Sequence, residues 1–223
     1  MNSSLIELKN ITKTYISGER EQRVLKKINL SIQSGEYISI CGPSGCGKSS
    51  LLNIIGLLDT PSSGEYFIDG IEVSAANKKK KAALRNGMFG FVFQSFNLID
   101  DYSVLKNVEL PLKYKSEKVA DKKEVATDRL QKVGLIQYAD YFPSQLSGGE
   151  QQRVAVARAL AADTRVLLVD EPTGNLDSAN GDQVMALLKE LNQSGVTIIL
   201  VTHDKRYADM ANRVINLLDG EVI

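Results

Sequence analysis

The stretch YISICGPSGCGKSSLLNIIGLL, residues 37–58, decides the fold of this chain. It begins with the short apolar run YISIC, which predicts a buried strand, and it ends with SSLLNIIGLL, whose apolar residues have helical spacing. Between them lies the pattern G-x-x-x-x-G-K-S, from Gly42 to Ser49. In this context of strand, loop and helix, the pattern is typical of a loop whose backbone amides surround a phosphate group.

The residues of this loop have distinct expected roles in binding a nucleotide. The glycines let the backbone curl so that successive N–H groups face the phosphates, Lys48 reaches the terminal phosphates, and the Ser49 hydroxyl ligates Mg²⁺. We interpret Cys46 as a small residue at a variable position of the loop and not as a redox centre. The expected nucleotide-binding residues are Gly42, Pro43, Ser44, Gly45, Cys46, Gly47, Lys48, Ser49 and Ser50.

The remaining sequence alternates between predicted strands and helices. We expect further strands at 5–15, 24–32, 89–93, 166–170 and 196–202, a strand pair at 65–73, and a closing hairpin at 214–223. We expect helices at 178–193 and 205–213, and a mostly helical block from about 97 to 162. This order predicts an α/β fold with a mostly parallel core sheet flanked by helices, an N-terminal antiparallel β subdomain and an inserted helical subdomain.

The composition limits the possible functions. The 223 residues include 27 Lys and Arg and 27 Asp and Glu, so no overall basic charge points to a nucleic-acid partner. The two cysteines, Cys41 and Cys46, do not indicate a disulfide framework, and we expect a reducing cytoplasmic environment. The N-terminus has no secretory signal, and no apolar run approaches the roughly 20 residues that span a bilayer. We therefore expect a chain that is soluble when isolated, which is compatible with a membrane partner.

Polar side chains follow several of the predicted strands. Asp170 and Glu171 end the segment VLLVDE, at the carboxyl end of a strand where ligands of open α/β sheets bind. Asp170 is suited to hold Mg²⁺ through water, and Glu171 is suited to activate a water for attack on a γ-phosphate. His203 and Gln94 each follow another apolar strand. His203 is either a γ-phosphate contact or simply a polar residue at a strand end. Gln94 is either a ligand of Mg²⁺ or water, or likewise a polar strand end. Tyr15 is either an adenine-stacking ring or an ordinary core or surface residue.

The segment LSGGEQQRVAVARAL, residues 146–160, predicts a second anion-binding position. Ser147 and Glu150 have the spacing of a capping box, in which the serine caps the helix and the glutamate reaches back. A helix that begins with glycines exposes backbone N–H groups at the positive end of its dipole. The local sequence thus predicts a capping role for Ser147, and it does not identify which anion the second site binds.

These motifs together resemble the ATP-binding cassette of ABC transporters. GPSGCGKSS, Gln94, LSGGEQ, VLLVDE and His203 follow one another in that order and at matching separations. The resemblance covers essentially the whole chain, and LSGGEQ is specific because ordinary P-loop GTPases and kinases lack it. It implies a single ABC ATP-binding domain, residues 1–223, with the P-loop NTPase fold. Within it, a RecA-like core at about 1–95 and 163–223 and a helical signature subdomain at about 96–162 are expected.

The resemblance also implies an active ATPase with ATP and Mg²⁺ as ligands. Tyr15 looks like the adenine-stacking aromatic residue, and Gln94 looks like the loop glutamine that senses Mg²⁺ and the membrane subunit. The implied catalytic residues are Glu171, His203 and Lys48, and the implied Mg²⁺ residues are Ser49, Gln94 and Asp170, the last through water. In a head-to-tail homodimer, the residues expected to reach the ATP of the other subunit are Ser147, Gly148, Gly149 and Asp177.

GFVFQSFNLI, NVELPL and EPTGNLDS narrow the resemblance to the branch of macrolide and peptide exporters, lipoprotein-release ATPases and the cell-division cassette. This branch implies a transmembrane permease subunit or a fused membrane domain as partner, at the cytoplasmic face of the inner membrane. The alternative is a non-transport ATPase that signals mechanically to a membrane partner. The chain is then either a free subunit or one part of a longer polypeptide. The run KKKK at 78–81 is interpreted as a solvated helix face and not as a lipid contact.

Overall fold

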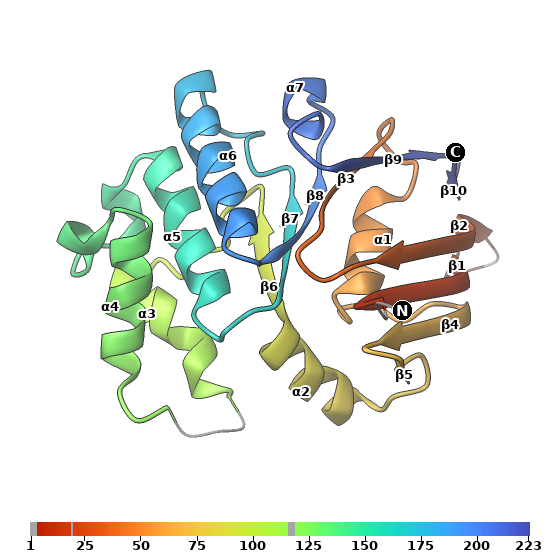
Figure 1. The fold of residues 1–223 in the computed structure, drawn as a ribbon, viewed down its shortest axis with the longest axis horizontal. Coiled ribbons are helices and arrows are strands. Elements are labelled where there is room, and N and C mark those ends of the chain that lie inside the picture. Colours follow the sequence, from red (N-terminus) through yellow and green to blue (C-terminus); the bar gives the residue numbers. More distant parts are fainter. Residues whose placement is uncertain (1–3, 19, 116–118) are drawn as a thin grey trace. The chain divides into compact units, whose positions relative to one another are not determined.

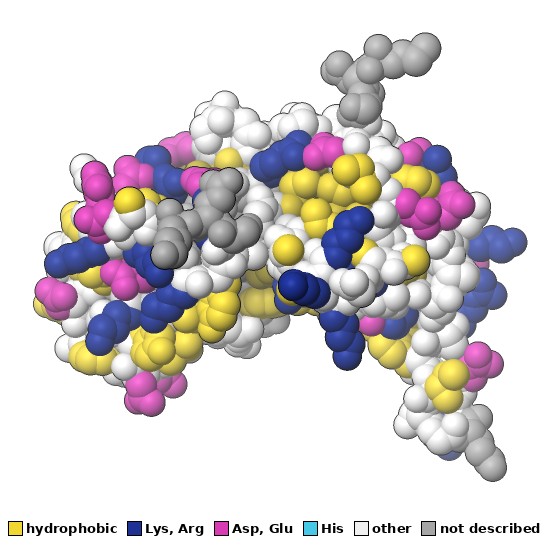
Figure 2. Space-filling model, turned by 90° about the horizontal axis from the view of Figure 1, so that it is seen from below, with side chains coloured by type: hydrophobic (Ala, Val, Ile, Leu, Met, Phe, Trp, Pro, Cys, Tyr) yellow, Lys and Arg dark blue, Asp and Glu magenta, His cyan; other side chains and the backbone are white. Residues whose placement is uncertain are grey.

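The computed structural model describes residues 4–18, 20–115 and 119–223. The chain divides into two compact units, Met1–Ala82 with Thr197–Ile223 and Ala83–Val196. Each unit contains both strands and helices, and α2 (Lys78–Met88) lies at the boundary between them in sequence. Basic and acidic side chains are interspersed on the face drawn in Figure 2, in keeping with the equal numbers of the two charges. None of the helices among the described residues is long and apolar enough to cross a membrane.

The first unit contains an antiparallel sheet with the strand order β2, β1, β4, β5 (Figure 1). Its strands are β1 (Ile6–Ser17), β2 (Arg20–Ile32), β4 (Ser63–Ile68) and β5 (Ile71–Glu72). Successive side chains of a strand point to opposite faces, and a register shift between Leu8 and Ile11 changes the parity of this alternation in β1. The buried side chains of β1 are therefore Ile6, Leu8, Ile11 and Lys13. A lysine therefore continues an otherwise apolar, inward-facing row.

The parallel part of the first unit is centred on β3 (Tyr37–Cys41). It runs parallel to β8 (Thr197–Val201) on one side and to β9 (Arg213–Leu218) on the other. The hairpin partner of β9 is β10 (Glu221–Val222), and the helices are α1 (Lys48–Ile55) and α7 (Lys205–Ala208). Because parallel neighbours end at the same edge, the loop after β3 and the residues after β8 emerge side by side.

The second unit pairs β6 (Phe89–Phe93) with β7 (Val166–Asp170) in parallel. The helix α5 (Gly148–Leu160) packs on β6 and contacts α3 (Val104–Glu109), α4 (Lys122–Lys132) and α6 (Ser178–Gln193). The described residues of this unit also form short 3₁₀ helices at Leu110–Lys113, Ile136–Tyr138 and Pro143–Gln145. Phe93 pairs with Asp170 in the register, so the residues that follow β6 and β7 also emerge side by side.

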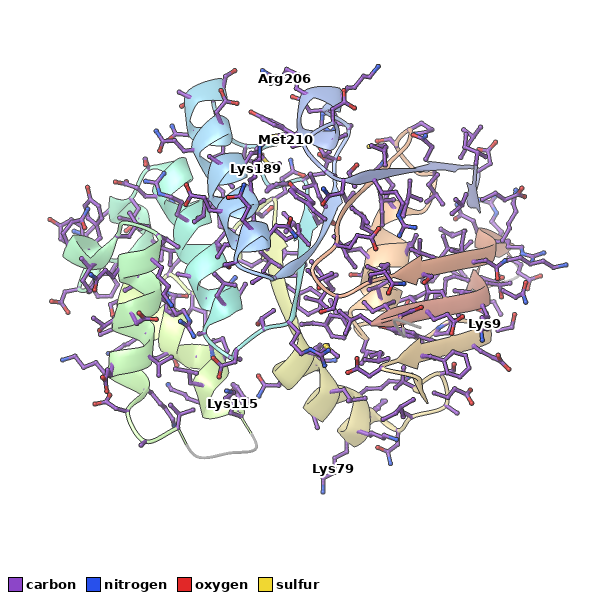
Figure 3. The ribbon with its side chains drawn as sticks, viewed as in Figure 1. Lys9, Lys79, Lys115, Lys189, Arg206 and Met210 are labelled. Carbon is purple, nitrogen blue, oxygen red and sulfur yellow. The ribbon has the colours of Figure 1, made fainter. Side chains whose placement is uncertain are left out.

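The predicted α/β class, the antiparallel N-terminal sheet and the parallel strands are confirmed. YISIC, FGFVF and VLLVD coincide with β3, β6 and β7, and neither Cys41 nor Cys46 forms a disulfide. The helix predicted over 205–213 is shorter, because the Asn212 amide already donates to the Tyr37 carbonyl of β3 at 2.8 Å. The solvated face predicted for 78–81 holds for Lys79, which projects away from α2 in Figure 3, but is wrong for Lys81, which is buried.

Candidate functional site

The loop between β3 and α1 has the geometry of a phosphate cradle. Gly47 has a φ of 108°, and a Cβ there would lie 2.9 Å from the Val24 carbonyl oxygen, so that only glycine fits. Helix α1 has no side-chain cap at its N-terminus, which leaves backbone amides of its first turn for an anion. Lys48 folds back over the loop, where its Nζ donates to the carbonyls of Gly42 at 2.8 Å and Pro43 at 3.0 Å. An ammonium group and open helix amides thus face the same loop.

Two other predicted residues of the first unit lie close to this loop. Tyr15, on β1, is 42 % exposed, and its hydroxyl lies 3.4 Å from Ser50 Oγ on α1. The Tyr15 hydroxyl also donates to Asp59 Oδ2 at 2.9 Å. His203 is exposed and follows β8, next to the loop that follows β3. Hydrogen bonds from Arg206, followed by the nearby positive charges, hold the pKa of Asp204, the neighbour of His203, below its usual value.

The second unit places the predicted acidic residues beside Gln94. Asp170 is the last residue of β7, and Glu171 follows it with a φ of 46°, a left-handed conformation that glutamate rarely adopts. Strained residues of this kind concentrate at functional sites, because the strain must be held by the surrounding structure. The Glu171 carbonyl accepts a hydrogen bond from the Gly174 amide at 3.1 Å, which closes the turn.

Gln94 is held by Asn175, a residue that the sequence did not single out. Asn175 Nδ2 donates to the Gln94 carbonyl at 3.0 Å, and Gln94 Nε2 donates to Asn175 Oδ1 at 3.4 Å. The two side chains therefore connect the residue after β6 to the loop after β7. Asparagine in the polar stretch EPTGNLDS carried no pattern that would have distinguished this residue from a turn former.

The second predicted anion site is the N-terminus of α5, and its capping box is confirmed. Glu150 Oε2 accepts from both the amide and the hydroxyl of Ser147, at 2.8 Å each, and the Glu150 amide faces Ser147 Oγ at 3.4 Å. These hydrogen bonds, the serine hydroxyl first among them, hold the pKa of Glu150 below its usual value. The Tyr138 hydroxyl also donates a hydrogen bond to the Glu150 carboxylate, and this bond raises the pKa of Tyr138. The Ser147 hydroxyl is thus engaged within its own chain.

Asn180 joins this helix start to Asp177. Asp177 caps α6 and accepts from the Asn180 amide at 2.9 Å and from Asn180 Nδ2 at 2.7 Å. A Cβ on Gly149 would lie 2.3 Å from Asn180 Oδ1, so the asparagine packs directly on the glycine backbone. The structure therefore brings the two segments LSGGEQ and GNLDS into direct contact.

Arg158, in the last turn of α5, holds the turn that follows Gln94. Its guanidinium donates to the Phe96 carbonyl at 2.8 Å and also to the Asn97 carbonyl. Phe96 and Asn97 both have left-handed backbone, with φ values of 59° and 51°. The forked guanidinium matches two adjacent carbonyl acceptors and so stabilises a conformation that non-glycine residues disfavour.

The comparison with known proteins decides the family. A sequence profile described as ABC transporter matches residues 25–174, more than half of the chain, and includes the phosphate cradle, Gln94, LSGGEQ and VLLVDE. The chain belongs to the ABC transporter family.

Relatives of this ABC cassette fall into two sizes. The uncharacterized ABC transporter ATP-binding protein MJ1508 of Methanocaldococcus jannaschii is 47 % identical, over 98 % of this chain and 98 % of that protein. The macrolide export ATP-binding/permease protein MacB of Hyphomonas neptunium is 48 % identical, over 100 % of this chain but 35 % of MacB. The chain thus spans about a third of the length of the macrolide exporters that it matches.

A solved structure extends this similarity to the fold. The ATP-binding cassette MJ0796, in a dimeric post-hydrolysis state bound to ADP and Pi, has a TM-score of 0.90 and 47 % identity. The match covers 97 % of this chain and 96 % of that chain. The resemblance inferred from the motifs is therefore confirmed, and the chain is an ATP-binding ATPase cassette with the ABC ATPase fold.

Proposed function

We propose that this cassette hydrolyses ATP as a homodimer and drives a membrane permease. The observation that carries the proposal is the contrast between its two helix starts. The N-terminus of α1, inside the phosphate cradle, has no side-chain cap, whereas Ser147 and Glu150 close the N-terminus of α5. The chain thus has one helix N-terminus that is open to phosphate and one that its own side chains cap. We expect the second helix N-terminus to complete the phosphate site of another subunit.

In the first unit, we assign ATP binding to the cradle and Tyr15. Lys48 exchanges its two carbonyl acceptors for phosphate oxygens, which are stronger partners for an ammonium group. The backbone of the loop surrounds the phosphates, and every residue of the loop except Pro43, which has no N–H group, offers an amide to them. These residues are Gly42, Ser44, Gly45, Cys46, Gly47, Ser49 and Ser50. The exposed Tyr15 ring stacks on adenine, and the exposed His203 contacts the γ-phosphate.

The residues present fit Mg²⁺. Ser49 and Gln94 offer neutral oxygens and Asp170 a carboxylate, which are the hard ligands that Mg²⁺ prefers. Among the described residues no group of three or more His, Cys, Asp or Glu side chains is placed to hold a metal by itself. That suits an ion that keeps waters and phosphate oxygens in its shell. When bound, Mg²⁺ neutralises charge on the transferred phosphate.

We assign the general base to Glu171. Glu171 directly follows Asp170 at the end of β7, and β7 pairs with β6, which ends just before Gln94. From there Glu171 accepts a proton from the attacking water, and His203 and Lys48 balance the charge that develops on the γ-phosphate.

We propose that Ser147, Gly148, Gly149 and Asp177 act on the ATP of the partner subunit. The hydroxyl of Ser147 must leave Glu150 to reach that phosphate, so the capping bond is exchanged for an intermolecular one. The division into a RecA-like core at about 1–95 and 163–223 and a helical subdomain at about 96–162 belongs to this proposal.

The membrane partner follows from the relatives. MacB carries a permease in the same polypeptide as its cassette, and this chain matches the cassette third. We propose that a permease, separate or fused, binds this chain at the cytoplasmic face of a membrane and that the complex exports a macrolide, peptide or lipoprotein.

The dimer is tested by measuring ATP turnover per chain at increasing protein concentration. We expect the specific activity to rise with concentration and a dimer to form with ATP in size exclusion. Constant specific activity with a monomer throughout would refute the dimer.

Lys48→Ala tests the cradle: we expect ATP binding at least about tenfold weaker, because a charge-assisted bond is lost. The matched control is Lys79→Ala, on an exposed lysine, and equal affinities of the two variants would refute the assignment.

A further inference from the structure

A cluster of three charged side chains contacts Tyr15 through two of its members, although none of the three belongs to the motifs that define the family. Lys13, on β1, is only 8 % exposed and Lys81, on α2, only 9 %, and Asp59 forms an ion pair with Lys13. Burying a charge is costly unless it is paired and hydrogen-bonded. A cluster of this kind therefore needs either a structural or a functional explanation.

The cluster is fully connected. Lys13 Nζ donates to Asp59 Oδ1 at 2.6 Å and to the Thr60 carbonyl at 2.8 Å. Lys81 Nζ donates to Thr60 Oγ1 at 3.0 Å, and the Thr60 amide donates to Asp59 Oδ1 at 2.7 Å. Partial burial acts against ionisation of Asp59, but the bonds from Lys13, Thr60 and Tyr15 outweigh it and lower its pKa. Asp59 is thus a carboxylate that accepts three hydrogen bonds, from Lys13, Thr60 and Tyr15.

The same carboxylate and ammonium both contact the Tyr15 side chain. The second oxygen of Asp59, Oδ2, accepts from the Tyr15 hydroxyl at 2.9 Å. Lys13 Nζ lies over the Tyr15 ring, 4.7 Å from its centroid. One end of the ring is therefore tethered and one face is covered by a cation, while 42 % of the residue remains exposed.

We infer that Lys13 and Asp59 are positioning residues, which hold the Tyr15 ring so that its uncovered face receives the nucleotide base. The inference rests on the proposed stacking of Tyr15 on adenine and adds what holds the ring in place. A ring that is already held in one orientation loses less side-chain entropy when a base stacks on it. Lys13 contributes a cation–π contact and Asp59 a charge-assisted hydrogen bond.

Stability alone does not require this arrangement. Replacing a buried ion pair by apolar side chains of similar volume is often neutral or stabilising. A structural role would therefore change the unfolding of the chain, whereas a positioning role changes how strongly the base contributes to nucleotide binding. The two roles are separated by comparing ATP with inorganic tripolyphosphate, which has the phosphates without base or ribose.

The quantity to measure is the Kd for tripolyphosphate divided by the Kd for ATP. We expect Lys13→Met and Tyr15→Phe each to lower this ratio by about three- to tenfold, from loss of the cation–π contact and the tether. The Kd for tripolyphosphate should stay within about twofold, because the cradle is untouched. Lys13→Arg keeps a cation over the ring and should retain the ratio, and Lys79→Met is the matched control on an exposed lysine.

A spectroscopic readout is available because the chain has no tryptophan. In the variant Tyr15→Trp, the introduced indole is the single tryptophan, and ATP but not tripolyphosphate should quench it. Adding Lys13→Met to this variant should reduce the quench, because an unheld ring stacks less completely. An equal quench with and without Lys13 would count against positioning.

The failures of the two proposals are distinguishable. If Tyr15→Ala leaves the ratio unchanged, the base does not stack on this ring and the proposed adenine contact is wrong. If Tyr15→Ala abolishes the base contribution while Lys13→Met, Asp59→Asn and Tyr15→Phe all keep it, the positioning inference alone is overturned. Tyr15→Phe keeps the Lys13–Asp59 ion pair intact, so it decides the question even if Asp59→Asn does not fold.

Discussion

Glu150 Oε2 accepts hydrogen bonds from both the amide and the hydroxyl of Ser147, at 2.8 Å each. One carboxylate oxygen thus accepts the backbone N–H at the N-terminus of α5 and also the hydroxyl of the serine that is proposed to contact phosphate. The capping box is a local device for helix stability, but here it also determines where the hydroxyl points before a partner subunit arrives.

Replacing Glu150 by alanine should destabilise the isolated chain by about 0.5–1 kcal/mol, because the reciprocal half of the capping box is lost. Urea unfolding of the two proteins measures this difference. Glu124→Ala is a matched control, since Glu124 also lies in a first turn, on α4, and accepts no capping bond there. If both variants lost the same free energy of unfolding, the bond between Glu150 and Ser147 would contribute nothing beyond the effect of an acidic residue in a first helical turn.

Replacing Glu171 by glutamine should reduce ATP turnover by at least about a hundredfold, because an amide cannot take the proton from water. Binding of ATP should persist, and the ATP-bound dimer should accumulate in size exclusion. A variant with normal turnover would remove Glu171 from the role of general base. Measuring ATP affinity beside turnover separates a chemical defect from a binding defect.

Replacing Gly149 by alanine should displace Asn180, because the new methyl group would lie 2.3 Å from its Oδ1. We expect a loss of about 1–3 kcal/mol in the free energy of unfolding, the usual cost of overpacking. The double variant Gly149→Ala with Asn180→Gly removes the obstructing side chain and should recover part of that loss. Additive effects of the two substitutions would contradict direct contact as the cause.

The ion pair that contacts Tyr15 should make stability depend on pH. The folded pKa of Asp59 lies below its unfolded value, so its contribution is present above the unfolded value and is lost as the pH falls through the folded one. We expect Asp59→Asn to lower the thermal midpoint at pH 7, where it leaves Lys13 and Lys81 without their carboxylate. The difference from the unsubstituted chain should shrink below about pH 4. A constant difference from pH 7 to pH 3 would contradict this prediction.

The sequence predicted the elements that local patterns encode. YISIC, FGFVF and VLLVD were recognisable as strands because short apolar runs bounded by glycine or charge suit buried parallel strands, and Ser147 and Glu150 were recognisable by spacing alone. Nucleotide-binding positions were predicted for the same reason, since a phosphate cradle is contiguous in sequence.

The contacts between distant segments were not predictable in this way. Asn175 on Gln94, Asn180 on Gly149 and Arg158 on Phe96 each join residues that are at least 31 positions apart, and polar side chains in loops carry no periodicity. Lys13 left no such signal either: strict alternation from Ile6 and Leu8 would point it to the opposite face, and the register shift between Leu8 and Ile11 changes that parity. Its partner Asp59 lies in DTPSSGE, a polar segment in which no pattern distinguishes it from a turn former.

Arg158 binds the turn after Gln94 through main-chain oxygens only. The contact therefore requires a guanidinium group at position 158 and a left-handed backbone at positions 96 and 97. It does not require particular side chains at 96 and 97. For protein engineering, side chains at 96 and 97 are therefore open to exchange as far as this contact is concerned, provided that Arg158 and the backbone conformation of the two residues are retained.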